Sequence, residues 1–309
     1  MKDVLLEKMS YDLLLKKEQI IHLILSAPHR YKVYQIPKKS GAGMRTIAQP
    51  AKEVKILQYW VIENCFPLMP IHRAATAYVK DKNIRDNCEP HIKNPYFLKL
   101  DFKDFFPSIK SDDFIQYMKN IGNITFDDID IQRLARILFW CPKEYTGLQL
   151  SIGAPSSPYL SNAIMYRFDN EIDLYCTQHN ISYTRYADDM TFSMLDKTLR
   201  ENVQQKVIEL LQSIPFPQLE LNNKKTIWGS KAHRRMITGL IISNDEKISL
   251  GRERKRRIRA QLNYAINGKL TPEQKKSLSG MLAFVRNIEP DFVLRLEKKY
   301  GRELISNLR

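Results

Sequence analysis

Two adjacent carboxylates lie between two short stretches that have the composition of β-strands. Residues 181–186 and 190–194 are rich in β-branched, aromatic and apolar side chains, and Asp188 and Asp189 stand between them. Such runs, joined by a few polar residues, are typical of a β-hairpin. Two neighbouring carboxylates at its tip repel each other, and no helix start is present to offset their charge. A simple polar turn is the alternative, but the charge of the pair favours a bound divalent cation.

A third carboxylate, Asp101, ends another apolar run. Residues 96–101 read Tyr-Phe-Leu-Lys-Leu-Asp, so we expect a strand whose last residue projects from the sheet. Three carboxylates from neighbouring strand ends can hold two Mg²⁺ ions about 3.5–4 Å apart, an arrangement that catalyses in-line phosphoryl transfer. Asp104 is a rival acid in this segment, and we interpret it as solvated or helix-capping. The other acidic pairs, at 112–113 and 127–128, are placed as helix-capping residues are.

The positive charge of the chain is concentrated towards its C-terminal end. The 49 Lys and Arg residues exceed the 34 Asp and Glu residues by 15. Residues 222–309 hold 21 Lys and Arg against 8 Asp and Glu, which is +13 of that total. A basic but merely solvated surface is the alternative. Charge gathered in one part of a chain favours a nucleic-acid partner, because phosphate contacts release counterions.

The sequence points neither to export nor to a membrane. The four cysteines form no CxxC pair and no zinc-ligand spacing, so we expect reduced and mostly buried thiols. The first residues are charged, unlike a signal peptide, and no stretch reaches membrane-spanning length. We therefore expect a cytoplasmic protein with no membrane partner.

Hydrophobic periodicity predicts mixed α and β structure along the whole chain. Strands are expected over 31–36 and 44–48, joined by a turn at Ser40–Gly43, and near 225–228 and 236–243. Helices are expected over 1–27, 51–67, 111–120, 128–139, 156–178 and 199–213, and from 251 onward with breaks near 268 and 289–290. A length of 309 residues predicts two or three lobes that share one body.

Four motifs in the expected order resemble those of reverse transcriptases. Tyr186-Ala-Asp-Asp189 is similar to the catalytic signature of that family, and the stretch 98–108 is similar to its companion palm motif. The stretches 151–158 and 223–226 resemble the next two motifs. The resemblance runs from about Tyr31 to the C-terminus, which is nearly the whole chain.

Within that family the chain resembles the bacterial retron reverse transcriptases. The stretch Asn-Cys-Glu-Pro-His at 87–91 is similar to their asparagine–histidine motif, and Ile-Thr-Gly at 237–239 is similar to their valine–threonine–glycine motif. Two residues depart from the family pattern: Cys88 stands where alanine is usual, and Ile152 where glutamine is common.

The resemblance implies an α+β right-hand polymerase fold. The implied parts are an N-terminal helical segment over 1–27, fingers over 28–95, a palm of antiparallel sheet and helices over 96–230, and a basic, mainly helical thumb over 231–309. The implied activity is RNA-directed DNA synthesis that copies part of a structured non-coding retron RNA. Priming from a guanosine 2′-hydroxyl would give branched RNA–DNA, known as msDNA.

The resemblance also implies a cofactor and partners. Two Mg²⁺ ions, with Mn²⁺ as a substitute, would be held by Asp101, Asp188 and Asp189, which are the implied catalytic residues. The implied partners are the cognate RNA and its DNA product, dNTPs, an effector protein of an anti-phage defence system, and host RNase H acting separately.

Roles in substrate binding follow from the same resemblance. Phe106 is implied as a gate that excludes a 2′-hydroxyl, the alternative being a plain core ring. Arg45 is implied to bind the triphosphate, because a guanidinium fork suits phosphate oxygens. Gly153 is implied to shape the backbone beside the templating base, since glycine allows close approach. Lys225 is implied to assist the pyrophosphate leaving group, with Lys224 as a near-equal candidate.

Nucleic-acid contacts are predicted at two places. The first is the pair of retron-like motifs, with Asn87, His91, Thr238 and Gly239; for His91 a plain helix-end position is the alternative. The second is a basic cluster expected on one helix. A solvated face needs fewer charges than this cluster has, so RNA contact is favoured. The cluster consists of Arg252, Arg254, Lys255, Arg256, Arg257 and Arg259.

Two alternative functions stay open at this point. One is another bacterial reverse transcriptase, of the abortive-infection, diversity-generating or group II intron kinds, against which the two retron-like motifs argue. The other is a non-catalytic RNA-binding scaffold of a defence complex, against which the intact carboxylate trio argues.

Overall fold

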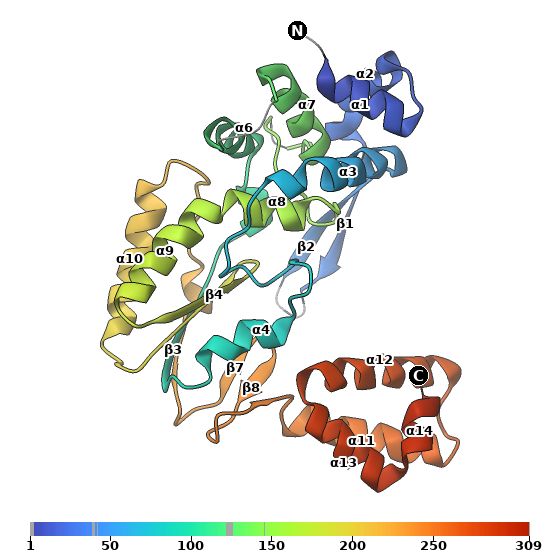
Figure 1. The fold of residues 1–309 in the computed structure, drawn as a ribbon, viewed down its shortest axis with the longest axis vertical. Helices are drawn as coiled ribbons and strands as arrows, with labels where there is room; N and C mark the ends of the chain where they lie inside the picture. The colour runs from blue at the N-terminus through green and yellow to red at the C-terminus, as the bar shows by residue number, and fades with distance from the viewer. Residues whose placement is uncertain (1–2, 39–40, 42, 122–125, 145, 309) are drawn as a thin grey trace.

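Two helices, α1 (Val4–Leu13) and α2 (Lys17–Ser26), start the chain where the periodicity predicted one helical segment. Leu14 separates them because its φ of 54° is left-handed, which ends the ladder of helical hydrogen bonds. The computed structural model describes residues 3–38, 41, 43–121, 126–144 and 146–308. Figure 1 shows this helical pair at the opposite end of the molecule from the C-terminal helices.

The region predicted as fingers contains a β-hairpin and a helix. Strands β1 (Tyr31–Pro37) and β2 (Met44–Pro50) pair antiparallel, as predicted. Ser40 and Ala42 of the predicted turn lie outside the described residues. The helix α3 (Lys52–Asn64) follows, and the short helix α4 (Ile84–Cys88) leads into a 3₁₀ turn, η3 (Glu89–His91).

A four-stranded antiparallel sheet forms the centre of the palm, in the order β4-β5-β3-β6. Strand β3 spans Tyr96–Asp101 and ends in the predicted acid. The predicted hairpin is present as β4 (Ser182–Tyr186) and β5 (Asp189–Met194), and β6 (Ile227–Ser230) completes the sheet. Helices α9 (Tyr166–Gln178) and α10 (Leu199–Ser213) lie beside the sheet (Figure 1).

The remaining palm helices follow the sequence pattern with one exception. Helices α6 (Ser111–Asn120) and α7 (Asp128–Leu138) have the predicted extents. Both acidic pairs cap helices: the Asp113 carboxylate accepts from the Lys110 N–H at 2.7 Å, and the Asp127 carboxylate accepts from the Asp130 N–H at 2.8 Å. The exception is the helix predicted over 156–178, which is divided at Met165 into α8 (Ser157–Ile164) and α9.

The C-terminal region begins with a small sheet that was predicted as one strand. Strands β7 (Arg235–Ile237) and β8 (Leu240–Ile242) turn about Thr238 and Gly239, whose φ angles of 46° and 80° are left-handed, and β9 (Ile248–Ser249) adds a third strand. The described helices that follow show the two predicted breaks and a third, at Gly301, that was not predicted: α11 (Arg252–Ile266), α12 (Pro272–Ile288), α13 (Pro290–Tyr300) and α14 (Arg302–Asn307).

Buried apolar side chains form two clusters. The larger one joins the N-terminal helices to the palm sheet and its helices. The smaller one lies within residues 237–308, with Cys88 of α4 added to it. Cys88 therefore packs in the core of the C-terminal region, and its Sγ donates to the Ile237 carbonyl at 3.5 Å. Among the described residues, every helix is too short or too polar to cross a membrane.

Candidate active site

The predicted carboxylate trio meets at one end of the palm sheet. In the antiparallel register Asp101 of β3 lies directly opposite Asp189 of β5, so the two side chains share one face of the sheet. Asp188 lies in the turn between β4 and β5, and its carbonyl accepts from the Phe102 N–H at 3.2 Å. The turn depends on Ala187, whose φ of 58° is left-handed. The pairing of β3 with β5, together with the turn between β4 and β5, therefore brings the three acids together.

The electrostatics of the trio call for a positive partner. Burial raises the pKa of Asp101 to about 6, the Lys225 ammonium opposes this rise, and the charge of Asp188 adds to it. Burial, followed by the charge of Asp189, also raises the pKa of Asp188. Asp101 and Asp188 thus each carry a desolvation cost and a repulsion that a cation would offset.

Lys225 reaches the trio from the short turn η4 (Asn223–Lys225). Its Nζ donates to both carboxylate oxygens of Asp101, at 2.8 and 2.9 Å. Of the two candidate lysines, Lys225 is therefore the one with a contact in the catalytic centre. Its partner in this structure is a carboxylate, and its predicted action on pyrophosphate stays a prediction.

The side chains of this site can supply only part of the ligands that a Mg²⁺ ion needs. Within the described ranges, no group of three or more His, Cys, Asp or Glu side chains is close enough to hold a metal ion. Mg²⁺, however, keeps several waters and takes one or two carboxylates plus substrate phosphates, instead of a cage made only of protein groups. The cross-strand pair of Asp101 and Asp189, with Asp188 beside it, is a donor set of that kind.

Phe106, the predicted gate residue, lines a cavity of about 320 Å³. Phe106 follows Phe105 in the short helix α5 (Phe105–Ser108) and is half-buried. The ring of Tyr78 lies across from it, with 6.5 Å between the centroids. The lining residues are Lys55, Tyr59, Tyr78, Phe106, Ser151, Ile152, Gly153, Ala154, Pro155, Ser157 and Pro158.

Gly153 permits a close backbone approach, as predicted, but the partner is the protein itself. Its φ is +130°, and a Cβ there would lie 3.0 Å from the Ala48 carbonyl oxygen and 3.1 Å from the Ile47 side chain. The Ile152 carbonyl accepts from the Ala48 N–H at 2.9 Å, so this loop is paired with β2. Ile152 thus makes a backbone contact that does not depend on its side chain.

Arg45 lies exposed on β2, opposite Ile36 in the fingers hairpin. Its positive charge acts on Asp188, where it opposes the burial that raises the pKa of that carboxyl. It also acts on Tyr78, whose pKa is raised by burial and by the charge of Asp188. The positive charge of Arg45 therefore favours the ionised form of Asp188 in the catalytic centre.

The predicted nucleic-acid contacts of Asn87 and His91 are contradicted by their burial, because each is 1% exposed. His91 Nδ1 pairs with the Ser193 hydroxyl at 2.7 Å, and its Nε2 pairs with the Thr184 hydroxyl at 2.8 Å. Both ring nitrogens are thereby occupied, and the ring joins β4 to β5. Burial lowers the pKa of His91 to about 3, so the imidazole is neutral. Asn87 Oδ1 accepts from the Thr76 hydroxyl at 2.8 Å.

The basic cluster lies on α11, as predicted, and most of it is exposed; Lys255 is the exception. The Lys255 ammonium is paired with Glu289, and its contact with RNA is not supported. Arg254 extends to the turn of the valine–threonine–glycine-like motif, because a Cβ at Gly239 would lie 3.1 Å from its guanidinium. Thr238 is half-buried, and its hydroxyl donates to the Ile84 carbonyl at 3.4 Å.

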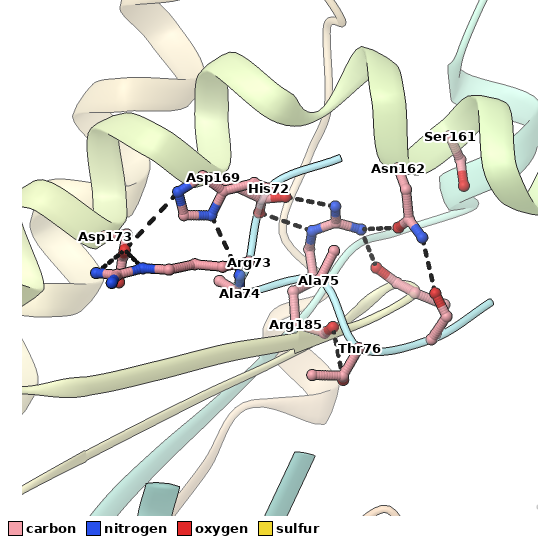
Figure 2. A network of polar contacts seen from close by, with 12 residues as sticks. His72, Arg73, Ala74, Ala75, Thr76, Ser161, Asn162, Asp169, Asp173 and Arg185 are labelled. Atoms are coloured by element: carbon pink, nitrogen blue, oxygen red, sulfur yellow. Dashed lines mark hydrogen bonds and ion pairs between the residues drawn. The ribbon is translucent and has the colours of Figure 1, made fainter. Parts of the chain in front are cut away.

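Sequence reasoning missed Arg185, which is fully buried in β4 (Figure 2). Its guanidinium is paired with Asp169 of α9, with 2.8 Å from Nε to Oδ1. It also donates to the Ala187 carbonyl at 2.9 Å, one residue before the catalytic pair. The available signal was an arginine inside a strand otherwise predicted to be buried, since such a charge requires a partner.

Comparisons with known proteins agree with this geometry. The family described as "Reverse transcriptase (RNA-dependent DNA polymerase)" matches residues 36–242. The chain is 40% identical to the retron Ec83 reverse transcriptase of Escherichia coli, covering 97% of this chain and 93% of that protein. It is 35% identical to the retron Ec73 enzyme of Escherichia coli, covering 92% of each chain. It is 32% identical to the retron Ec86 enzyme of the same species, covering 93% of this chain and 88% of that protein. The chain belongs to the retron reverse transcriptases, and its right-hand fold is that of an RNA-directed DNA polymerase.

Proposed function

We propose that this polymerase copies part of one structured non-coding RNA in the cytoplasm, starting from a guanosine 2′-hydroxyl, and so makes branched RNA–DNA. The observation that carries the proposal is the meeting of Asp101, Asp188 and Asp189 at one end of the palm sheet, in a chain with two retron-like motifs. Carboxylates on neighbouring strands suit two-metal nucleotidyl transfer. The 2′-hydroxyl as primer is inferred from the family resemblance.

Two Mg²⁺ ions, or Mn²⁺ in their place, are the cofactors we propose for this trio. When bound, they would polarise the phosphate and lower the pKa of the attacking hydroxyl. Asp101 and Asp189 would hold them from opposite strands, and Asp188 from the turn. Lys225, which donates to Asp101 in this structure, would exchange that carboxylate for a phosphate oxygen.

For nucleotide binding we propose three further residues. The exposed Arg45 would bind the triphosphate, since a guanidinium offers two parallel donors to phosphate oxygens. Phe106 would lie under the sugar and leave no room for a 2′-hydroxyl, a role supported by its place in the wall of the cavity. Gly153, which lines the same cavity, would keep the backbone close to the base pair.

We propose that the exposed arginines of α11, together with the Thr238–Gly239 turn, contact the cognate RNA. The contact of Arg254 with Gly239 makes the turn and the helix one continuous surface. From the family resemblance we further infer an effector protein of a defence system as a partner, and removal of the template RNA by host RNase H acting separately.

The test is primer extension with Mg²⁺ by Asp188→Asn and Asp101→Asn. We expect DNA synthesis to fall by at least about three orders of magnitude, since the ligand charge is lost but the shape is kept. RNA binding should change little, because the proposed RNA surface lies elsewhere. Asp104→Asn is the matched control: Asp104 is exposed, three residues after Asp101, and its φ of 44° suits asparagine equally well. Near-normal synthesis by either trio variant would refute the assignment and favour the scaffold alternative.

A further inference from the structure

We propose that Asn162 is a positioning residue that holds one wall of the nucleotide cavity in place against the catalytic turn. The inference rests on the proposed binding of the incoming nucleotide in that cavity. It concerns a buried polar network around Arg185, which is separate from the predicted catalytic and nucleotide-binding side chains.

Asn162 is completely buried in α8 and joins two segments that are far apart in the sequence (Figure 2). Its Nδ2 donates to the Ala77 carbonyl at 2.7 Å. Its Oδ1 accepts from Arg185 Nη1 at 3.1 Å. One amide group therefore connects the segment before α4 with the strand that leads to the catalytic pair.

Arg185 carries the connection on to the catalytic turn. The same Nη1 donates to the Ala187 carbonyl at 2.9 Å, which fixes the peptide plane between Ala187 and Asp188. The other side of the guanidinium is anchored on Asp169, which also accepts from the Tyr183 hydroxyl at 2.8 Å. A guanidinium held by a buried carboxylate has little freedom to move, so it is a rigid support for the turn.

Each of the two peptide planes that the network fixes adjoins a residue with a left-handed backbone conformation. Ala77 precedes Tyr78, whose φ is 60°, and Ala187 itself has a φ of 58°. Left-handed backbone is unfavourable for residues other than glycine and persists only where the surroundings enforce it. The hydrogen bonds to the Ala77 and Ala187 carbonyls supply that enforcement.

Tyr78 is the point at which the network meets the cavity. It is half-exposed, it lines the cavity, and its ring faces the ring of Phe106. If Phe106 limits the space at the sugar of the nucleotide, the ring of Tyr78 must keep its position for a 2′-hydroxyl to be excluded. Asn162 would thus act through Tyr78 on nucleotide selection and through Arg185 on the position of Asp188.

The primary experiment measures single-nucleotide extension of an annealed primer, with dGTP and GTP, by Asn162→Ala. We expect a severalfold higher KM for dGTP and a severalfold lower preference for dGTP over GTP. Ser161→Ala is the matched control, since Ser161 is equally buried on the same helix and its hydroxyl donates to the Pro158 carbonyl of that helix at 2.8 Å. It should keep the KM and the sugar preference of the parent enzyme.

Asn162→Asp separates the two links and gives a second variant that is nearly isosteric with the parent. The aspartate keeps an acceptor for Arg185, but it presents an oxygen to the Ala77 carbonyl, and the charge of Arg185 is already paired with Asp169. We expect the same loss of sugar preference in the folded protein, with a lower melting temperature because the added buried carboxylate has no counter-charge of its own. Unchanged KM and preference in a folded Asn162→Asp would overturn the proposal.

A double-mutant cycle with Tyr78→Ala tests whether Asn162 acts through Tyr78. Tyr78 is half-exposed, so its truncation should not prevent folding. We expect Tyr78→Ala to lower the sugar preference, and Asn162→Asp to lower it no further in that background. Additive losses would contradict the route through Tyr78. Inactivity of the parent enzyme would instead refute the proposed function, and this outcome is distinct from unchanged selectivity in an active variant.

Discussion

The sequence identifies Phe106 as a candidate residue, but only the structure shows that its side chain lines a cavity. Its spacing of five residues after Asp101 is visible in the sequence, but whether its ring lies in a core or in a cavity is not. The position depends on Tyr78 and Gly153, which are distant along the chain. The carboxylate trio was predictable for the opposite reason, because neighbouring strand ends alone bring it together.

Phe106→Ala should admit ribonucleotides. Removing the ring opens the volume that a 2′-hydroxyl needs, so the preference for dGTP over GTP should fall by about two orders of magnitude, which corresponds to roughly 2–3 kcal/mol. Phe106→Tyr keeps a planar ring and should keep the preference. The ratio of kcat/KM for the two nucleotides is the measurement. An unchanged ratio in Phe106→Ala would place the gate elsewhere.

His91 was predicted to touch nucleic acid and does not, because two hydroxyls of the palm sheet occupy its nitrogens. The asparagine–histidine motif revealed that the residue is special, but tertiary burial decided its role. The same holds for Lys255, whose ammonium is paired with Glu289, the residue between α12 and α13. The local sequence shows which side chains are charged or polar, whereas the tertiary structure determines which residues they contact.

A buried neutral His91 should make stability depend on pH. An unfolded histidine titrates near pH 6.5, whereas burial lowers the pKa of His91 to about 3. Between these values the unfolded chain binds a proton that the folded chain excludes, so stability falls as the pH decreases, by at most about 1.4 kcal/mol per unit. His91→Gln should therefore be less stable at pH 7.5 but show a flatter dependence between pH 6.5 and 4.5. Urea unfolding of both proteins gives the difference curve, in which unaltered carboxylates cancel; parallel curves would contradict the assignment.

At the scale of elements, extents were predicted well where the apolar pattern is regular and poorly where one residue changes the backbone. The breaks at Leu14 and Met165 and the turn at Thr238 are examples. Leu14 and Thr238 adopt left-handed conformations that neither residue type announces. The sequence therefore predicted one element in each place where two exist, and the small sheet of β7, β8 and β9 was missed.

Gly153→Ala should loosen the loop that pairs with β2. An alanine there meets the Ala48 carbonyl at 3.0 Å and must also adopt a φ of +130°, so we expect a loss of about 1–3 kcal/mol of stability. Gly268→Ala is the matched control, because its φ of +65° is also left-handed but no atom lies within 4 Å of the added Cβ. That change should cost about 1 kcal/mol. Urea unfolding gives both values, and equal losses would show that contact with β2 is unimportant.

At the scale of the whole molecule, charge and chemistry occupy different lobes. The carboxylate trio lies in the palm, whereas residues 231–309 hold 19 Lys and Arg against 8 Asp and Glu, which is +11 of the net charge of +15. Figure 1 shows the C-terminal helices as a separate lobe, which the small sheet of β7 and β8 links to α4. Composition predicted this division, but the link through Cys88 and Ile237 required the structure.

The division of lobes predicts that the C-terminal lobe selects the cognate RNA. A palm must accept every template base, so discrimination between RNAs needs a surface that reads shape and unpaired loops. The exposed Arg254, Arg256 and Arg257 of α11 would provide such a surface, and Arg254 lies against the turn at Gly239. Changing all three to alanine should remove up to three phosphate contacts and reduce the slope of log affinity against log salt by roughly two units.

Lys275→Ala, Lys276→Ala and Lys298→Ala combined form the control, because this variant loses the same charge from exposed positions on α12 and α13. Synthesis on the cognate RNA should fall sharply in the arginine variant only, because general electrostatic attraction depends on net charge, whereas recognition depends on where the charges lie. Extension of a generic annealed primer at low salt should survive in both variants, since the palm is unchanged. Equal losses on cognate and generic templates, or equal losses in the two variants, would mean that α11 supplies attraction without selection.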